Sequence, residues 1–191
     1  MQIAQSKTRE QFPLSNKKII KKTIAGTISY AIFFLIIVGF FSLTLIGGGL
    51  NSETQGTYDW LIGAIVVGLL GLLTVIFFLT YLYERWYFAV YFYDLTPDFI
   101  QIKKGPITPR EITIPYERIQ DVYVDQDLFD RIFGLYDVHL SSATASSGME
   151  AHIDGVEKQA AEGLRAILLE TIKQRISKNR FTNSTAENQV S

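Results

Sequence analysis

The chain has 191 residues, of which 48% are hydrophobic and 19% charged, with a formal net charge of −1 and no cysteine. The absence of cysteine excludes disulfides, thiolate metal sites and cysteine nucleophiles, and the near-neutral charge argues against nucleic-acid binding. The charges are unevenly distributed, because residues 23–52 and residues 60–83 contain no Asp, Glu, Lys or Arg. A membrane-spanning helix needs about 20 apolar residues. The sequence therefore predicts a membrane hairpin joined to an ordinary polar domain.

The first two segments are a basic N-terminus, residues 1–22, and an uncharged run, residues 23–50. The run is long enough for a transmembrane helix. Gly47, Gly48 and Gly49 are expected to end this helix, because glycine is a poor helix former. A cleaved signal peptide is the alternative. It is disfavoured because its apolar core would be shorter and would start nearer the N-terminus.

A short loop, residues 51–59, and a second transmembrane helix, residues 60–84, follow. Residues 1–22 contain six Lys and Arg residues, whereas the loop contains none. Loops on the cytoplasmic side of membrane helices carry an excess of Lys and Arg. We therefore expect a multi-pass protein of the cell membrane, with both termini in the cytoplasm and the loop outside.

The two predicted membrane helices contain no Asp, Glu, Lys, Arg or His before Glu84. Intramembrane proteases, proton-coupled carriers and voltage sensors place ionisable residues within the membrane, so these classes are disfavoured. Small residues recur at helical spacing, Ala25 with Ser29 and Ala64 with Gly68 and Gly71. This spacing favours packing of the two helices against each other, with contact between copies of the chain as the alternative.

The remaining sequence changes character after residue 85. Short runs with period-two alternation, rich in β-branched and aromatic residues and separated by Gly, Pro and Asp, predict antiparallel strands. After Asp154 and Gly155 the apolar residues recur at every third or fourth position, which predicts one amphipathic helix. Residues 85–178 are expected to form a small barrel or sandwich covered by this helix, and residues 179–191 a disordered tail.

Several motifs follow one another in order within residues 80–175. They are Tyr93-x-Leu95-Thr96, Gly105, Ile114-Pro115-Tyr116 with Ile119-Gln120-x-Val122, and Arg131-Ile132-Phe133-Gly134-Leu135 with Val138. Together they resemble the YdbS-like bacterial pleckstrin-homology (PH) domain family, also called the membrane-flanked domain family. The resemblance implies two membrane helices followed by a cytoplasmic PH-like barrel, of about seven antiparallel strands in two sheets, capped by a C-terminal helix.

The residues of these motifs are interpreted as determinants of the fold: Gly105, Pro115, Arg131, Phe133 and Gly134. Phe133 is expected to fill the barrel, Gly134 to adopt an unusual backbone conformation and Arg131 to pair with a nearby carboxylate. A structural role is preferred because no reactive partner accompanies these residues in the sequence.

Candidate chemistry elsewhere is weak. Glu150, His152 and Asp154 match no established zinc spacing. The acidic run of Asp121, Asp125, Asp127 and Asp130 lacks the glycine that a calcium loop needs, since the sixth position counted from Asp125 is Asp130. The serines and threonine of residues 141–147 are typical of a turn. We therefore predict no catalytic residue, no metal and no cofactor, and hence a protein that is not an enzyme.

The candidate binding patch is a basic hairpin in which Lys103, Lys104 and Arg110 flank a Gly-Pro turn. Such residues near an anionic leaflet are each worth about 1 kcal/mol, which makes the hairpin a candidate patch for lipid headgroups or a partner. An ordinary solvated turn is the favoured interpretation, because acidic residues outnumber basic ones in the domain.

These observations predict a non-enzymatic tether or scaffold that presents a PH-like domain at the inner face of the cell membrane. The expected partners are membrane lipids, a membrane or cytoplasmic protein, or a second copy of the chain, and not nucleic acid. The alternative is an accessory subunit of a membrane enzyme or transporter whose catalytic residues lie in a partner.

Overall fold

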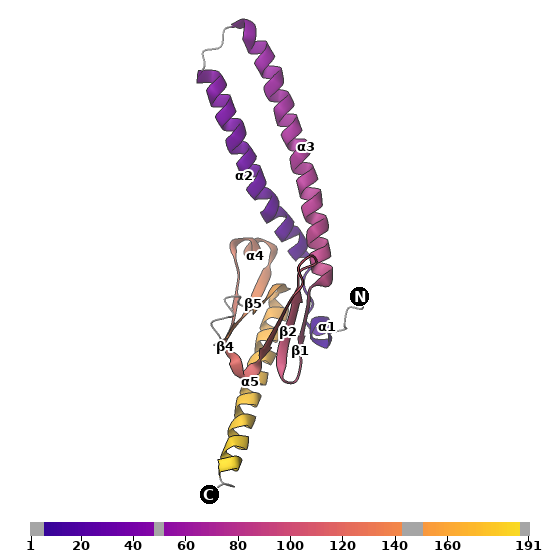
Figure 1. Ribbon diagram of the computed structural model, residues 1–191, viewed down its shortest axis with the longest axis vertical. Helices are drawn as coiled ribbons and strands as arrows, with labels where there is room; N and C mark the ends of the chain where they lie inside the picture. The colour runs from indigo at the N-terminus through magenta and orange to yellow at the C-terminus, as the bar shows by residue number, and fades with distance from the viewer. Residues whose placement is uncertain (1–5, 48–51, 143–150, 188–191) are drawn as a thin grey trace. The chain divides into compact units, whose positions relative to one another are not determined.

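The computed structural model describes residues 6–47, 52–142 and 151–187 (Figure 1). The chain forms two compact units. One unit is Ile19–Arg85, here called the helical hairpin. The other combines Met1–Lys18 with Trp86–Ser191 and is here called the domain. The helical hairpin is therefore an insertion in the sequence of the domain.

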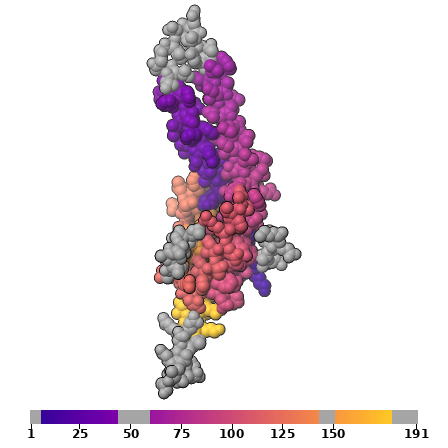
Figure 2. Space-filling view, viewed as in Figure 1, coloured from indigo at the N-terminus to yellow at the C-terminus, as the bar shows by residue number. Residues whose placement is uncertain are grey.

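The helical hairpin consists of α2 (Lys17–Gly47) and α3 (Ser52–Val90). Both are long and apolar enough to cross a membrane, by length and composition. Their apolar side chains lie at the surface (Figure 2), with Leu35 72% and Val67 70% exposed. Each helix is longer than its uncharged run: α2 begins at Lys17, and α3 already begins within the segment that was predicted as a loop. No proline occurs from Lys17 to Val90 to interrupt either helix.

Gly68 and Gly71 of α3 do not pack against α2, contrary to the prediction. A Cβ atom added at either glycine would meet nothing within 4 Å. A pocket between the two helices is lined by larger apolar side chains, among them Ile37, Phe41 and Ile65.

The domain contains two antiparallel three-stranded sheets, each a meander in which sequential strands pair. The first sheet has the strands β1 (Phe92–Leu95), β2 (Phe99–Lys104) and β3 (Arg110–Pro115). The second sheet has the strands β4 (Ile119–Asp125), β5 (Leu135–Ser142) and β6 (Ala151–Glu157). A short helix α4 (Leu128–Phe133) joins β4 to β5, the 3-10 turn η1 (Tyr116–Arg118) joins the sheets, and α5 (Lys158–Glu187) follows β6.

The core lies between the sheets and α5. Alternate strand residues such as Ile100, Ile102 and Val138 are fully buried, as strand periodicity requires. The helix α5 adds Leu164 and Leu168 from its apolar stripe. The expected order of strands followed by a covering helix is therefore confirmed.

The expected barrel of about seven strands is wrong in two respects. The described residues contain six strands, and these strands do not close into a barrel. On one side, Pro115 ends β3 and η1 interrupts the ladder before β4 begins. On the other side, the gap between β1 and β6 is occupied by the N-terminal segment, which sequence analysis had separated from the domain.

This segment, residues 6–18, is here called the clasp, and it contains the short helix α1 (Lys7–Gln11). At the β1 edge, the Ser6 hydroxyl donates to the Tyr93 carbonyl (2.6 Å) and Thr8 Oγ1 accepts from the Leu95 amide (3.1 Å). At the β6 edge, Leu14 forms an antiparallel bridge with Val156. The clasp thereby covers the exposed edge strand of each sheet.

The C-terminal helix also extends further than predicted. α5 runs to Glu187, although residues 179–191 were expected to be disordered. No glycine or proline occurs between Gly163 and that residue, so no sequence signal ends the helix after residue 178.

Candidate functional site

The predicted basic residues lie together at the tip of the β2–β3 hairpin. Lys104 is the register partner of Arg110, and Lys103 forms an ion pair with its own partner Glu111 at 3.2 Å. Gly105 makes the tight turn with φ of 97°, where an added Cβ would lie 2.6 Å from the Thr108 carbonyl oxygen. The structure thus brings the three cations together, although Glu111 offsets part of their charge.

The residues interpreted as fold determinants occupy different environments. Pro115 ends β3 and precedes η1, and Gly134 ends α4 in the left-handed conformation with φ of 67°. Phe133 is only half-buried and lies outside the hydrophobic core, so it does not fill a barrel. Arg131 is exposed and its guanidinium makes no ion pair with any residue that the structure describes. The carboxylate nearest in the sequence, Asp130, is instead buried at the start of α4.

The acidic run that resembled a calcium loop has a structural use. The Asp127 side chain accepts a hydrogen bond from the Asp130 amide (2.6 Å), and the Asp130 side chain accepts one from the Asp127 amide. This reciprocal arrangement is a capping box that starts α4. Two of the four acidic residues therefore stabilise a helix terminus.

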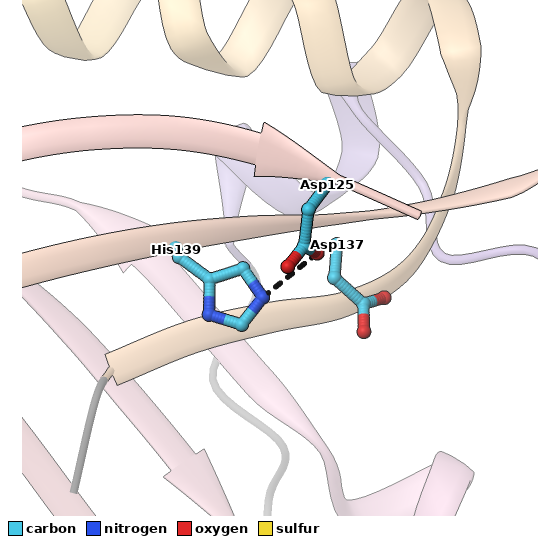
Figure 3. Close-up of side chains that lie close together, drawn as sticks. All are labelled: Asp125, Asp137 and His139. Atoms are coloured by element: carbon cyan, nitrogen blue, oxygen red, sulfur yellow. Dashed lines mark hydrogen bonds and ion pairs between the residues drawn. The ribbon is translucent and has the colours of Figure 1, made fainter. Parts of the chain in front are cut away.

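A cluster of polar side chains lies on the outer face of the second sheet and was missed by sequence analysis. The ring of His139 stacks between Tyr123 (centroids 4.9 Å apart) and His152 (5.4 Å). His139 Nε2 lies 3.0 Å from Asp125 Oδ1, and Asp137 is the register partner of Asp125 (Figure 3). The strands β4 and β5 each show period-two alternation in the sequence, so their polar residues could be assigned to one face of a strand. Only the strand register shows that these polar side chains meet.

Among the residues that the structure describes, Asp125, Asp137 and His139 form a group that could hold a metal ion, since their ligand atoms lie within 4.8 Å of one another. These atoms already have partners in the protein. His139 Nε2 bonds to Asp125, and Asp137 Oδ1 accepts from the Gly155 amide (2.8 Å). We interpret the cluster as a hydrogen-bonded ladder across the sheet surface. Glu150, from the weaker zinc alternative, and residues 143–147 of the serine-rich turn lie outside the described residues.

A buried ion pair joins the clasp to β6. Lys18 Nζ lies 3.4 Å from Asp154 Oδ2 and 3.0 Å from the Asp154 carbonyl oxygen, and both side chains are less than 10% exposed. The same ammonium group lies 4.1 Å from the centre of the Tyr91 ring, a cation–π distance. Sequence analysis assigned Lys18 to the basic N-terminus, so nothing indicated that this lysine is a core residue of the domain.

The environment of this ion pair shifts the pKa of its neighbours. Burial, and then the charge of Asp154, raise the pKa of Asp137 to about 7. The same two causes, in the same order, raise the pKa of Tyr91 well above its usual value. Burial also raises the pKa of Tyr93, whose hydroxyl donates to the Phe12 carbonyl. Each shift favours a neutral group in the interior.

Two pockets among the described residues of the domain lie beside the clasp. One is lined by clasp and α5 residues and by Glu157, which pairs with Lys17 at 3.5 Å. A second is lined mainly by apolar and hydroxyl side chains, among them Phe12, Leu95 and Tyr116. Neither pocket contains His139, His152 or Asp137.

Comparison with known proteins agrees with this architecture. The family model described as Bacterial PH domain matches residues 30–172, a stretch that includes most of both apolar helices and every strand of the two sheets. No curated protein and no solved structure matches the chain. Because the match covers well over half of the sequence, and its span holds every strand and the first half of the covering helix α5, the chain belongs to the bacterial PH-domain family.

Proposed function

We propose that this protein is a membrane-anchored binding module of the YdbS-like type. In this proposal α2 and α3 cross the cell membrane, and the domain is held at its cytoplasmic face. PH domains are generally non-catalytic binding modules. The role proposed is therefore tethering, which raises the effective concentration of a partner at the membrane.

One observation carries the proposal: the segments on both sides of the helical hairpin fold into the same domain. Ser6 bonds to β1 residues, Leu14 bridges to Val156 and Lys18 pairs with Asp154. A domain built from both flanks requires both flanks to be on one side of the membrane. This supports a two-helix crossing independently of the excess of Lys and Arg in residues 1–22, which supports the cytoplasmic side.

The topology can be tested with single cysteines, because the chain has none of its own. Gln55→Cys lies between the predicted spans, Asn16→Cys in the clasp and Asp98→Cys between β1 and β2. We expect a membrane-impermeant maleimide to label position 55 in intact cells, and positions 16 and 98 only after permeabilisation. Labelling of positions 16 and 98 from opposite sides would contradict the proposal.

The partner can be sought by crosslinking the full chain in native membranes. A chain truncated after Tyr87 is the control, because it retains the predicted spans but lacks every strand. Crosslinks that require residues 88–191 would support the tether. Stoichiometric co-purification with one membrane complex would instead identify the protein as an accessory subunit of that complex.

A further inference from the structure

Three aliphatic side chains of the domain are exposed far more than any other large apolar residue described in it. Ile107 is 69% exposed, Leu128 73% and Ile132 69%, whereas the next values in the domain are 52% for Trp86 and 45% for Leu169. Leu128 and Ile132 are four residues apart in α4 and so share one face of that helix. Ile107 lies in the turn of the β2–β3 hairpin.

The strand register shows where the β2–β3 turn and α4 lie. Each is at the end of its own sheet at which the chain connects to the helical hairpin. In the first sheet, Phe92 pairs with Lys103, and only Tyr91 separates Phe92 from the end of α3. The β2–β3 turn is therefore at the end of the sheet that the chain enters from α3. The β2–β3 turn lies within about 15 Å of Lys103, measured along the strand.

The second sheet repeats this arrangement. Leu135, which follows α4 after a single glycine, pairs with Glu157, and Glu157 forms an ion pair with Lys17 at the start of α2. Within the domain, α4 thus lies at the same end of the second sheet as Glu157 and its partner Lys17, where the chain continues into α2. The three aliphatic residues together form what is here called the apolar rim.

Charged side chains flank the apolar rim. Lys103, Lys104 and Arg110 surround the turn that carries Ile107, and the exposed Arg131 lies between Leu128 and Ile132 in α4. Four acidic side chains lie in the same region, and each has a partner: Glu111 pairs with Lys103, Asp125 pairs with His139, and Asp127 and Asp130 form the capping box of α4. Aliphatic residues flanked by Lys and Arg are the composition of surfaces that lie at the boundary between headgroups and acyl chains.

We propose that the apolar rim inserts into the interfacial layer of the same bilayer that holds α2 and α3, with Arg110 and Arg131 at the lipid phosphates. This inference rests on the proposed function, because the rim can reach a bilayer only if the helical hairpin is embedded in one. The ligand is the lipid surface itself. The hairpin that sequence analysis marked as a headgroup patch becomes one of two contact points, and α4 is the other.

The experiment uses the full chain in nanodiscs containing anionic phosphatidylglycerol, with one fluorophore on a single introduced cysteine. Positions 107, 128 and 132 report on the rim, and Val67→Cys reports on the middle of α3. Ile176→Cys is the matched control, because Ile176 is 40% exposed and follows Arg175, which contacts Pro97 and Asp98 at the far end of the first sheet. The quenchers are lipids with a nitroxide either near the headgroup or deep in the acyl chain.

We expect the shallow quencher to quench the three rim positions severalfold more than position 176, and the deep quencher to quench position 67. If position 67 is not quenched, the hairpin is not embedded and the proposed function fails together with the inference. If position 67 is quenched and the rim resembles position 176, only the inference is overturned. Rim fluorophores that are shielded from water but not quenched by lipid would indicate a protein partner and would also overturn it.

A double substitution gives a second test. Leu128→Glu with Ile132→Glu changes two side chains that are about 70% exposed, so the domain is expected to remain folded, as Leu169→Glu should also leave it. In the double variant, shallow quenching at position 107 should fall severalfold, whereas Leu169→Glu should leave it unchanged. Equal quenching in the two variants would overturn the inference.

Discussion

The two ends of the clasp are attached to the domain by different chemistry. At β1 the contacts are hydrogen bonds and not ion pairs: Ser6 and Thr8 bond backbone atoms of the edge strand, and both hydroxyl groups also donate to the Asp94 carboxylate at 2.8 Å. At β6 the contacts combine backbone pairing at Leu14 and Ser15 with the buried charges of Lys18 and Asp154. A neutral hydrogen bond contributes about 1 kcal/mol net, whereas a buried charge that loses its partner costs about 3–5 kcal/mol. The β6 end should therefore dominate the stability of the clasp.

The largest effect is expected when the buried ion pair is broken. Lys18→Met keeps the length and apolar volume of the side chain but leaves the Asp154 carboxylate, less than 10% exposed, without its lysine. We expect the free energy of unfolding of the domain to fall by about 3–5 kcal/mol. Urea-dependent proteolysis in detergent micelles measures this change.

The neighbouring lysine provides the control. Lys17 pairs with Glu157 at 3.5 Å, but both side chains are more than half exposed, so Lys17→Met should cost about 0–1 kcal/mol. Adding Asp154→Asn to Lys18→Met should recover part of the loss, because it removes the carboxylate charge that Lys18 neutralises in the unsubstituted protein. Equal costs for the two lysine variants would show that the buried pair contributes no more to stability than the exposed one.

A somewhat smaller loss is expected from Gly155→Ala at the same end of the clasp. Gly155 has φ of 79°, and an added Cβ would lie 2.6 Å from Lys18 Cδ. Backbone strain and displacement of the buried lysine together should cost about 2–3 kcal/mol. Gly134→Ala has a similar backbone conformation, with φ of 67°, but open space around the Cβ, so it should cost only about 1–2 kcal/mol. Equal losses for the two variants in the same unfolding assay would contradict the contact with Lys18.

The charged end should also make stability depend on pH through Asp137. Its pKa is about 7 in the folded protein, raised first by burial and then by Asp154. The folded state therefore binds this proton more tightly than the unfolded chain, so the free energy of unfolding should fall as pH rises from about 4 to about 7. Above pH 7 the cost of ionising the buried carboxyl is present in full.

Asp137→Asn tests this dependence while keeping an oxygen that can accept from the Gly155 amide. We expect a gain of about 2–3 kcal/mol at pH 8, shrinking toward zero as pH falls to about 4. Thermal unfolding of both proteins across this pH range gives the measurement. A gain that is the same at every pH would show that the pKa of Asp137 does not differ between the folded protein and the unfolded chain.

Sequence reasoning predicted the elements whose signals are local. The alternation around Ile100 and Ile102, the stripe containing Leu164 and Leu168, and the two uncharged runs each depend on neighbouring residues. The features that it missed depend on contacts between distant residues. Lys18 and Asp154 are 136 positions apart, and the stack of His139 on Tyr123 requires the strand register. A lysine in a basic segment resembles an exposed lysine until its partner is known.

The smallest effects are expected at the β1 end of the clasp. Thr8→Val replaces the hydroxyl by a methyl group, which removes the acceptor of the Leu95 amide (3.1 Å) and the bond donated to the Asp94 carboxylate (2.8 Å). Ser6→Ala removes the bonds donated to the Tyr93 carbonyl and to Asp94, and the cap that accepts from the Arg9 amide. Each should cost about 1–2 kcal/mol. Ser177→Ala is the control, because its hydroxyl bonds only within the exposed part of α5, and it should cost near zero. The loss from Thr8→Val should be equal at pH 6 and pH 8, since neither the hydroxyl nor the amide titrates in that range. If the loss from Thr8→Val is equal at the two pH values while the effect of Asp137→Asn near β6 depends on pH, the clasp is held by two separable contacts. A loss at Thr8 of about 3 kcal/mol or more would mean instead that opening either end releases the whole segment.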